Sequence, residues 1–234
     1  MGKYYITGDT HGDFWKIEQL AKRNHLTEED VIIILGDVGF NYSGYIWDSL
    51  RKDEVSKTIP CTFFCIHGNH EMRPDGITGY TLKEWHEGKV WVDPQYPRLL
   101  FAKDGEVFDL NGKKTLVIGG AYSVDKLRRV AMGYRWFEDE QPSEQIKQYV
   151  VEQLDKVSWK VDVVLSHTCP YTYVPSEAFI SGIDPLTVDF TTELFLEKIE
   201  KRLDYQRWYC GHYHIEKRVD MDKLQFLYEK IQEF

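Results

Sequence analysis

Side chains that commonly bind divalent ions follow several short apolar segments, each beside a Gly or a Ser. They are Asp9, His11, Asp37, Asn69, His70, His167, His212 and His214. Asp9 and His11 are two residues apart, as are His212 and His214, so in an extended segment both members of each pair point the same way. The set offers imidazole nitrogens, carboxylates and one amide oxygen but no thiolate. This favours ions such as manganese, iron, zinc or cobalt and disfavours a structural cysteine-type zinc site.

Two ions would use these ligands better than one. Without His70, seven side chains remain, which is too many for one ion but suits two ions that share a carboxylate. Two ions about 3.5–4 Å apart with a bridging hydroxide form an arrangement for in-line displacement at phosphorus. Their charge of about +4, less about three for Asp9, Asp37 and the hydroxide, would attract a phosphate locally even in an acidic protein. The residue types therefore indicate metal-dependent hydrolysis of a phosphoester.

The segments that carry these side chains are typical of strands buried on both faces, because they are short, continuously apolar and bounded by Gly or Ser. We expect strands at residues 3–7, 31–35, 62–66, 116–118, 161–165 and 207–210. Ligands of open α/β sheets bind beyond the carboxyl ends of the strands, where the metal-binding side chains stand. Asp9, Asp37 and Asn69 follow one another at intervals of 28 and 32 residues, which suits successive βαβ units of about 30 residues.

Apolar residues at helical spacing lie between several of these segments. The pattern predicts helices over residues 14–21, 146–157 and 196–203. Asp13 is placed to cap the first helix, and Pro142 and Ser143 open the second.

Two other stretches are typical of antiparallel hairpins. Residues 89–118 contain short strand candidates separated by Pro, Asp-Gly and Asn-Gly turns, and residues 217–228 indicate a hairpin around Met221 and Asp222. Together with the strands and helices above, they predict an α/β fold, a sandwich of two mixed sheets flanked by helices. We expect residues 1–234 to form one domain.

Net charge and composition argue against some classes of binding partner. The 234 residues carry 29 basic and 38 acidic side chains, a net charge of −9, which argues against bulk binding of nucleic acid. The longest aliphatic run, residues 31–35, is far too short to span a membrane. The N-terminus has no cleavable apolar stretch, and the four Cys form no CxxC pair, which indicates reduced and mostly buried thiols. We expect a cytoplasmic protein with no membrane partner, and the sequence does not indicate its oligomeric state.

The ordered motifs resemble those of the calcineurin-like binuclear metallophosphoesterases. That family's series D-x-H, GD, GNH[ED], a lone His and G-H-x-H is matched in order from Asp9 to His214. The resemblance implies a two-sheet α/β sandwich with the site at its edge. It implies that one metal is bound by Asp9, His11, Asp37 and His214. It implies that the other is bound by Asp37, Asn69, His167 and His212, with Asp37 as the bridge.

His70 is not a metal ligand by this resemblance. It would lie over the phosphate, stabilise the developing charge and protonate the leaving alkoxide. Chemistry gives a second reason for the assignment, because an alkoxide leaves slowly and a well-placed proton donor accelerates such a step by about 10²–10⁴. The alternative role for His70 is a histidine that packs a loop or supports a neighbouring ligand.

The second motif departs from the pattern GDxxDR found in many members. Phe40 and Asn41 stand where the Asp that orients the catalytic His and the Arg that grips phosphate are expected. This departure argues against a protein phosphatase. Arg73, Arg128 and Arg129 are candidates for the missing phosphate ligand, since Arg suits bidentate contact with phosphate.

We therefore expect a hydrolase in which a metal-bridging hydroxide attacks a phosphate mono- or diester directly. Manganese is the first expectation for the two ions, with iron, zinc, cobalt and nickel as alternatives. The substrate would be a phosphorylated small molecule, a nucleotide or a peptide. Two alternatives remain open, a Ser/Thr-type protein phosphatase and a non-catalytic scaffold on the same fold.

Overall fold

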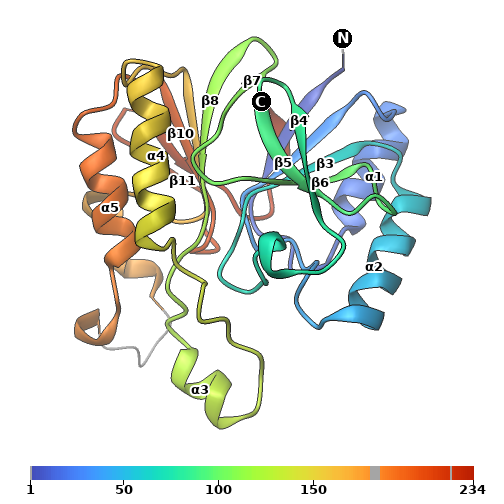
Figure 1. Cartoon of the computed structure of the whole chain (residues 1–234), viewed down its shortest axis with the longest axis horizontal. Helices are drawn as coiled ribbons and strands as arrows, with labels where there is room; N and C mark the ends of the chain where they lie inside the picture. The colour runs from blue at the N-terminus through green and yellow to red at the C-terminus, as the bar shows by residue number, and fades with distance from the viewer. Residues whose placement is uncertain (1, 180–184, 222) are drawn as a thin grey trace.

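Two β-sheets face each other, and helices cover their outer faces, in the computed structural model (Figure 1), which describes residues 2–179, 185–221 and 223–234. The first sheet contains, in spatial order, β13 (Gln232–Glu233), β1 (Tyr4–Thr7), β2 (Val31–Ile34), β3 (Thr62–Cys65), β6 (Leu99–Ala102), β5 (Gly88–Val92) and β4 (Thr81–Trp85). Strands β1, β2, β3 and β6 are parallel to one another, and β13, β5 and β4 pair antiparallel.

The second sheet has the same mixed character. It contains, in spatial order, β11 (Lys217–Val219), β12 (Leu224–Phe226), β10 (Arg207–Cys210), β9 (Val163–Ser166), β8 (Lys113–Ile118) and β7 (Val107–Leu110). The central strands β12, β10, β9 and β8 are parallel, whereas β11 and β7 are antiparallel to their neighbours.

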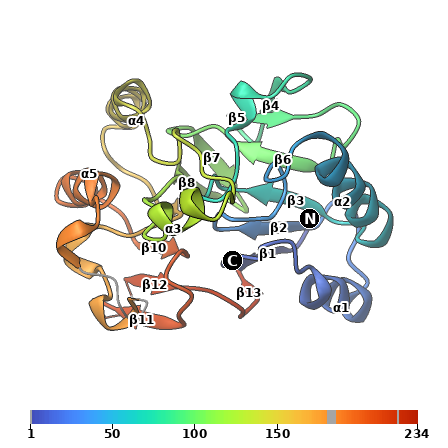
Figure 2. The same ribbon diagram turned by 90° about the horizontal axis from the view of Figure 1, so that it is seen from below.

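Two pairs of helices cover the sandwich from opposite sides (Figures 1 and 2). The first sheet is covered by α1 (Trp15–Asn24) and α2 (Tyr45–Thr58), and the second by α4 (Glu144–Lys156) and α5 (Thr191–Glu200). The short helix α3 (Lys126–Ala131) lies apart from both pairs, at the bottom of Figure 1. Single 3₁₀ turns are η1 (Pro74–Gly76), η2 (Tyr171–Tyr173), η3 (Ser176–Ala178) and η4 (Pro185–Thr187).

Alternation along the strands divides the hydrophobic interior into three layers. In β2, Ile33 faces the other sheet, whereas Ile32 and Ile34 face the helices α1 and α2. In the second sheet, Leu165 faces the first sheet and Val164 faces α4 and α5. Because both faces of these strands are buried, their sequences are continuously apolar, which is the pattern that predicted them.

The predicted fold class is confirmed, and the differences are local. All six predicted strands and three predicted helices are present, and Ser143 caps α4 by accepting from the N–H of Ile146. Phe14, not Asp13, is the N-cap of α1, although the Asp13 carboxylate still accepts from the N–H of Trp15 at 3.1 Å. The predicted hairpin at residues 217–228 forms as β11 and β12, and Asp222 lies outside the described residues.

Among the described residues, two helices and two strands were not predicted from the sequence: α2, α3, β4 and β13. The four Cys side chains are buried free thiols, as expected. In the part of the chain that the structure describes, no helix has both the length and the apolar character that crossing a membrane requires.

Candidate metal centre

The loops that follow β1, β2, β3, β9 and β10 meet at one edge of the sandwich. Parallel strands point their carboxyl ends to the same edge, so the side chains after each strand converge there. His11, Asp37, His212 and His214 all have positive φ, because the chain turns sharply as it leaves the strands. Gly36 allows one close approach: its φ is +99°, and a Cβ there would lie 2.1 Å from Nδ1 of His167. These turns therefore bring side chains that follow different strands close to one another.

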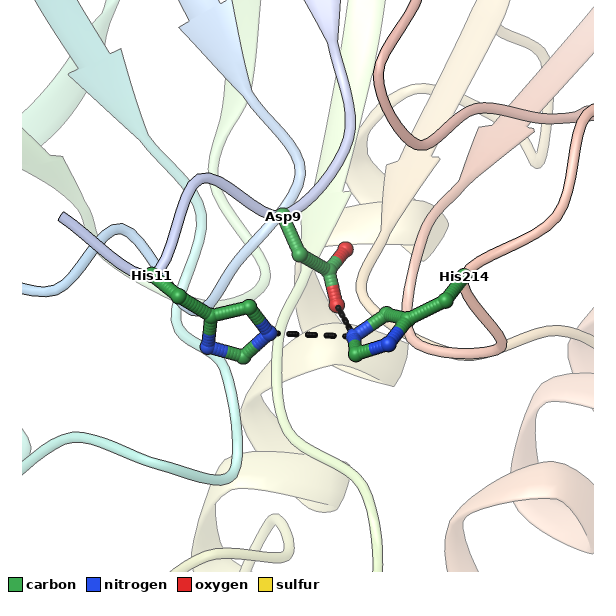
Figure 3. A group of neighbouring side chains, drawn as sticks. All are labelled: Asp9, His11 and His214. Atoms are coloured by element: carbon green, nitrogen blue, oxygen red, sulfur yellow. Dashed lines mark hydrogen bonds and ion pairs between the residues drawn. The ribbon is translucent and has the colours of Figure 1, made fainter. Parts of the chain in front are cut away.

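One cluster joins distant parts of the chain (Figure 3). Nε2 of His11 lies 3.0 Å from Nε2 of His214, and the same His214 nitrogen lies 3.3 Å from Oδ2 of Asp9. The Asp9 carboxylate is held in place by the backbone N–H of His212, at 2.9 Å from Oδ1. Ligand atoms of Asp9, His11 and His214 all lie within 4.8 Å of one another, so a single cation could contact all three.

A second cluster is buried behind the first. Oδ1 of Asn69 lies 2.8 Å from Nε2 of His167 and 3.0 Å from Nδ1 of His212. The amide orientation is defined, because Nδ2 of Asn69 donates to Oγ of Ser123 at 2.8 Å. Oδ2 of Asp37 lies 3.7 Å from Nε2 of His167, which completes the set.

The arrangement of hydrogen-bond donors and acceptors in this second cluster indicates which kind of ligand it could bind. Nδ1 of His167 donates to the carbonyl oxygen of Leu35 at 2.7 Å, so in a neutral ring the lone pair lies on Nε2. That lone pair faces the Asn69 oxygen at 2.8 Å, so two acceptors point at one another. A cation between them would satisfy both, and a carbonyl bond to the far ring nitrogen is the usual support of a metal-binding His. The residues present therefore fit a bound metal.

Burial and electrostatics favour a neutral His212 beside an ionised Asp37. Burial and the neighbouring His167 lower the pKa of His212 to about 3, so its ring is available as a neutral ligand. Burial alone would raise the pKa of Asp37, but the imidazoles of His167 and His70 hold it below its ordinary value.

The two clusters share the Asp9 carboxylate in this geometry. Ligand atoms of Asp9, Asp37 and His167 also lie within 4.8 Å of one another. Asp9 therefore borders both positions, whereas Asp37 belongs to the second group only, and the assignment of Asp37 as the bridging carboxylate stays a prediction.

His70 lies at the entrance to the centre. Its backbone N–H donates to Oδ1 of Asp37 at 2.8 Å, and its Nε2 lies 3.9 Å from Oδ2 of the same carboxylate. Nη2 of Arg129 lies 3.0 Å from Nε2 of His70, and Nε of Arg129 contacts both oxygens of Asp125, at 2.8 and 2.9 Å. Burial lowers the pKa of His70; Asp37 opposes this effect and Arg129 adds to it.

A cleft of about 200 Å³ opens beside His70. It is lined by His11, Asp37, Gly39, Tyr42, Arg51, His70 and Arg129. Arg51 comes from α2, and its Nη1 donates to the carbonyl oxygen of Gly39 at 2.6 Å. Two guanidinium groups, one from α2 and one from α3, therefore line a cleft that also contains the candidate ligands His11 and Asp37. The arrangement suits a phosphate group.

The predicted phosphate ligands differ in where they lie. Arg129 lines the cleft, whereas Arg128 is exposed on α3 and is not among the residues that line it. Arg73 is buried away from the cleft, where Nη1 pairs with Asp104 and Nε donates to the carbonyl oxygen of Asp139 at 2.9 Å. Arg73 therefore connects two loops and does not face the centre.

The residues that replace the GDxxDR pattern have structural roles. Phe40 is fully buried and stacks on Phe14, with ring centroids 5.1 Å apart. Oδ1 of Asn41 accepts from Nζ of Lys52 at 2.7 Å and from the hydroxyl of Tyr80 at 2.8 Å. Both positions belong to the packing under α2, so they can neither orient His70 nor grip phosphate.

Sequence reasoning missed four residues of this site: Ser123, Asp125, Arg51 and Tyr42. Ser123 and Asp125 lie five and seven residues after Ile118, in the loop that follows a predicted strand, and this location could have indicated them. Arg51 and Tyr42 depend on α2, whose apolar residues lack a clear helical period, so no comparable signal existed.

Comparisons with known proteins agree with the geometry. A family model described as calcineurin-like phosphoesterase matches residues 2–216. The solved structure of TT1561 of Thermus thermophilus is similar, with a TM-score of 0.51 and 13% identity, over 97% of this chain and 89% of that chain. The phosphopantetheinyl hydrolase PptH from Mycobacterium tuberculosis has a TM-score of 0.46 and 13% identity, over 97% of this chain and 88% of that chain. A comparison with curated proteins gave no match.

Proposed function

Because the chain belongs to the calcineurin-like phosphoesterase family, we propose that it is a metal-dependent phosphoesterase that hydrolyses a phosphate mono- or diester. The observation that supports this most directly is the buried Asn69 oxygen, which faces the imidazoles of His167 and His212 at 2.8 and 3.0 Å. The ligands come from positions 9 to 214, so the proposal assigns this activity to the chain as one domain.

Two ions would occupy the centre. Their ligands would be Asp9, His11, Asp37 and His214 for one and Asp37, Asn69, His167 and His212 for the other. When bound, divalent ions supply concentrated positive charge that polarises a phosphate and favours attack on phosphorus. Manganese is the first candidate, because the set combines imidazole, carboxylate and amide donors without a thiolate.

His70, Arg129 and Arg51 would act on the substrate. The two guanidinium groups would hold the non-bridging oxygens of the phosphate and keep it over the centre. A phosphate beside His70 would favour the protonated imidazole, and Nε2 would then donate that proton to the oxygen of the leaving alcohol.

Direct assay of the purified protein tests the proposal. The protein would be stripped with a chelator, loaded with Mn²⁺ and given p-nitrophenyl phosphate and bis(p-nitrophenyl) phosphate. We expect release of p-nitrophenolate only from the loaded protein, and a loss of about 10²–10⁴-fold in kcat for His70→Ala. If neither ester reacts with any divalent ion, the chain is a scaffold on this fold and the proposal fails.

A further inference from the structure

Exposed apolar side chains gather on the two segments that supply Arg51 and Arg129 to the cleft. Among the described residues, thirteen large hydrophobic side chains are exposed, and seven of them lie in two short segments, residues 46–50 and 127–134. They are Ile46, Trp47, Leu50, Leu127, Val130, Met132 and Tyr134. We call this set the apolar rim. Single exposed apolar residues are ordinary, but a cluster beside a site marks a contact surface.

The rim is built on the same elements as the cleft. Trp47 lies one helical turn before Arg51 on α2, so the two side chains share a face. Leu127 and Val130 share a face of α3, and Arg129 points from that helix toward His70. Each of these elements therefore carries both a guanidinium that lines the cleft and exposed apolar side chains.

Contacts hold the two segments next to each other. Nη1 of Arg135 donates to the carbonyl oxygen of Ser43 at 3.0 Å, and the rings of Tyr42 and Phe137 meet edge to face with centroids 6.1 Å apart. Helix α3 buries none of its residues against the rest of the protein. It therefore does not serve the core, and its apolar face is available to a bound molecule.

The size of the cleft indicates what the rim contacts. Sites that enclose a whole small ligand usually measure about 300–1,000 Å³. The cleft is about 200 Å³, so it can hold the phosphate group but not a large leaving group as well. The rest of the substrate must lie outside the cleft, and the two segments that supply its guanidinium groups carry the apolar rim.

Charge complementarity supports an anionic and apolar substrate. The chain has a net charge of −9, yet residues 126–135 contain no acidic side chain. Arg51 and Arg129 face the cleft between the two halves of the rim. On the basis of the proposed function, we infer that the substrate is an amphiphile, a phosphoester with a long alkyl or acyl group that lies across the apolar rim.

Two pairs of esters test this inference. The first pair consists of two diesters, p-nitrophenyl octyl phosphate and p-nitrophenyl methyl phosphate. The second consists of two monoesters, octyl phosphate and ethyl phosphate. Within each pair the type of phosphoester is the same, and only the length of the alkyl group differs. We expect the Mn²⁺-loaded protein to prefer an octyl ester by at least about tenfold in kcat/KM, since burial of several methylene groups favours binding. Trp47→Ser/Leu127→Ser should bring this ratio close to one. Leu194→Ser, an exposed leucine on α5, should leave the ratio as in the wild type.

The possible outcomes distinguish the phosphoesterase proposal from the amphiphile inference. If no ester reacts, the proposed function fails. If both members of each pair react equally well, or if the double variant keeps the preference, the phosphoesterase proposal stands and the amphiphile inference is overturned. Light scattering adds a third outcome: a wild-type dimer that the double variant converts to monomer would make the rim a subunit interface and would also overturn the inference.

Discussion

Nη2 of Arg129 lies 3.0 Å from Nε2 of His70, and because a guanidinium can only donate, the imidazole nitrogen is the acceptor. Arg129 is held in turn by both carboxylate oxygens of Asp125. Phe40 occupies the place of the Asp that orients the corresponding His in many relatives. A short helix outside the two-sheet core therefore supplies the contact that the second motif lacks.

Removal of this guanidinium should impair turnover. We expect Arg129→Ala to lower kcat/KM for a chromogenic ester by about 10²–10³, because a positioned donor to the phosphate is lost. Arg129→Lys should recover only part of the loss, since an ammonium group cannot contact His70 and phosphate as a fork. Arg128→Ala is the matched control on the same helix and should change kcat/KM less than about threefold. Equal losses for Arg128→Ala and Arg129→Ala would contradict the assignment.

Ser123 should determine how tightly the ion beside Asn69 is held. Its Oγ fixes the amide so that the oxygen faces His167, and we expect Ser123→Ala to weaken metal affinity by about 10–100-fold. Competition with a fluorescent chelator measures this affinity directly. Ser143→Ala is the control, because loss of that N-cap should cost about 1 kcal/mol of stability without changing metal affinity. An unchanged affinity in Ser123→Ala would show that the amide orientation does not matter.

Metal removal should lower thermal stability. Ions that bind only the folded chain stabilise it by about 2.7 kcal/mol at one hundred times their dissociation constant. For a chain of 234 residues this corresponds to a rise in Tm of roughly 5–10 °C on adding Mn²⁺ to stripped protein. Calorimetry with and without a chelator measures the shift. The His167→Ala variant should show a smaller rise in Tm on adding Mn²⁺. A rise equal to that of the wild type would mean that the ions bind elsewhere.

Glu193 should make the metal-free protein less stable at higher pH. Burial raises its pKa from 4.5 to about 7, above the value in the unfolded chain, so its contribution is fully present below about pH 4.5 and is lost as pH rises through 7. Glu193→Gln removes this dependence and can keep the contact with Thr168. We expect the variant to gain on the order of 3 kcal/mol over the wild type between pH 4.5 and pH 8. Urea unfolding of both proteins at both pH values measures this difference in the free energy of unfolding. The prediction is wrong if the free energy of unfolding changes equally with pH in the variant and the wild type.

Phe40 should be required for the fold and not for the chemistry. Its ring packs between Phe14 and Phe63 in the core under α1 and α2, so Phe40→Ala should cost about 3–5 kcal/mol of unfolding free energy. Where the variant stays folded at low temperature, kcat for a chromogenic ester should remain within a few-fold of the wild type. A large loss of kcat without a loss of stability would assign Phe40 a direct role in the site.

The sequence indicated the candidate metal ligands better than the other residues that line the cleft. Asp37 and Asn69 could be found because each follows a buried strand, and buried strands have an unmistakable apolar pattern. Arg51 could not, because α2 presents Ile46 and Trp47 to solvent, so its apolar residues do not trace a face toward the core. The role of Arg129 likewise depends on how α3 is placed, and a helix that buries none of its residues leaves no hydrophobic pattern to read.

The metal-binding side chains are widely separated along the polypeptide, and His11 touches His214 across 203 positions. The strand Gln232–Glu233 pairs with Tyr4–Thr7 beside them. The proposed metal centre therefore cannot form until a ribosome has translated beyond His214. A chain released early, even after His167, would lack two of the proposed ligands and several strands of the sheets, so we expect an unfinished copy to lack the proposed activity and to be open to proteolysis.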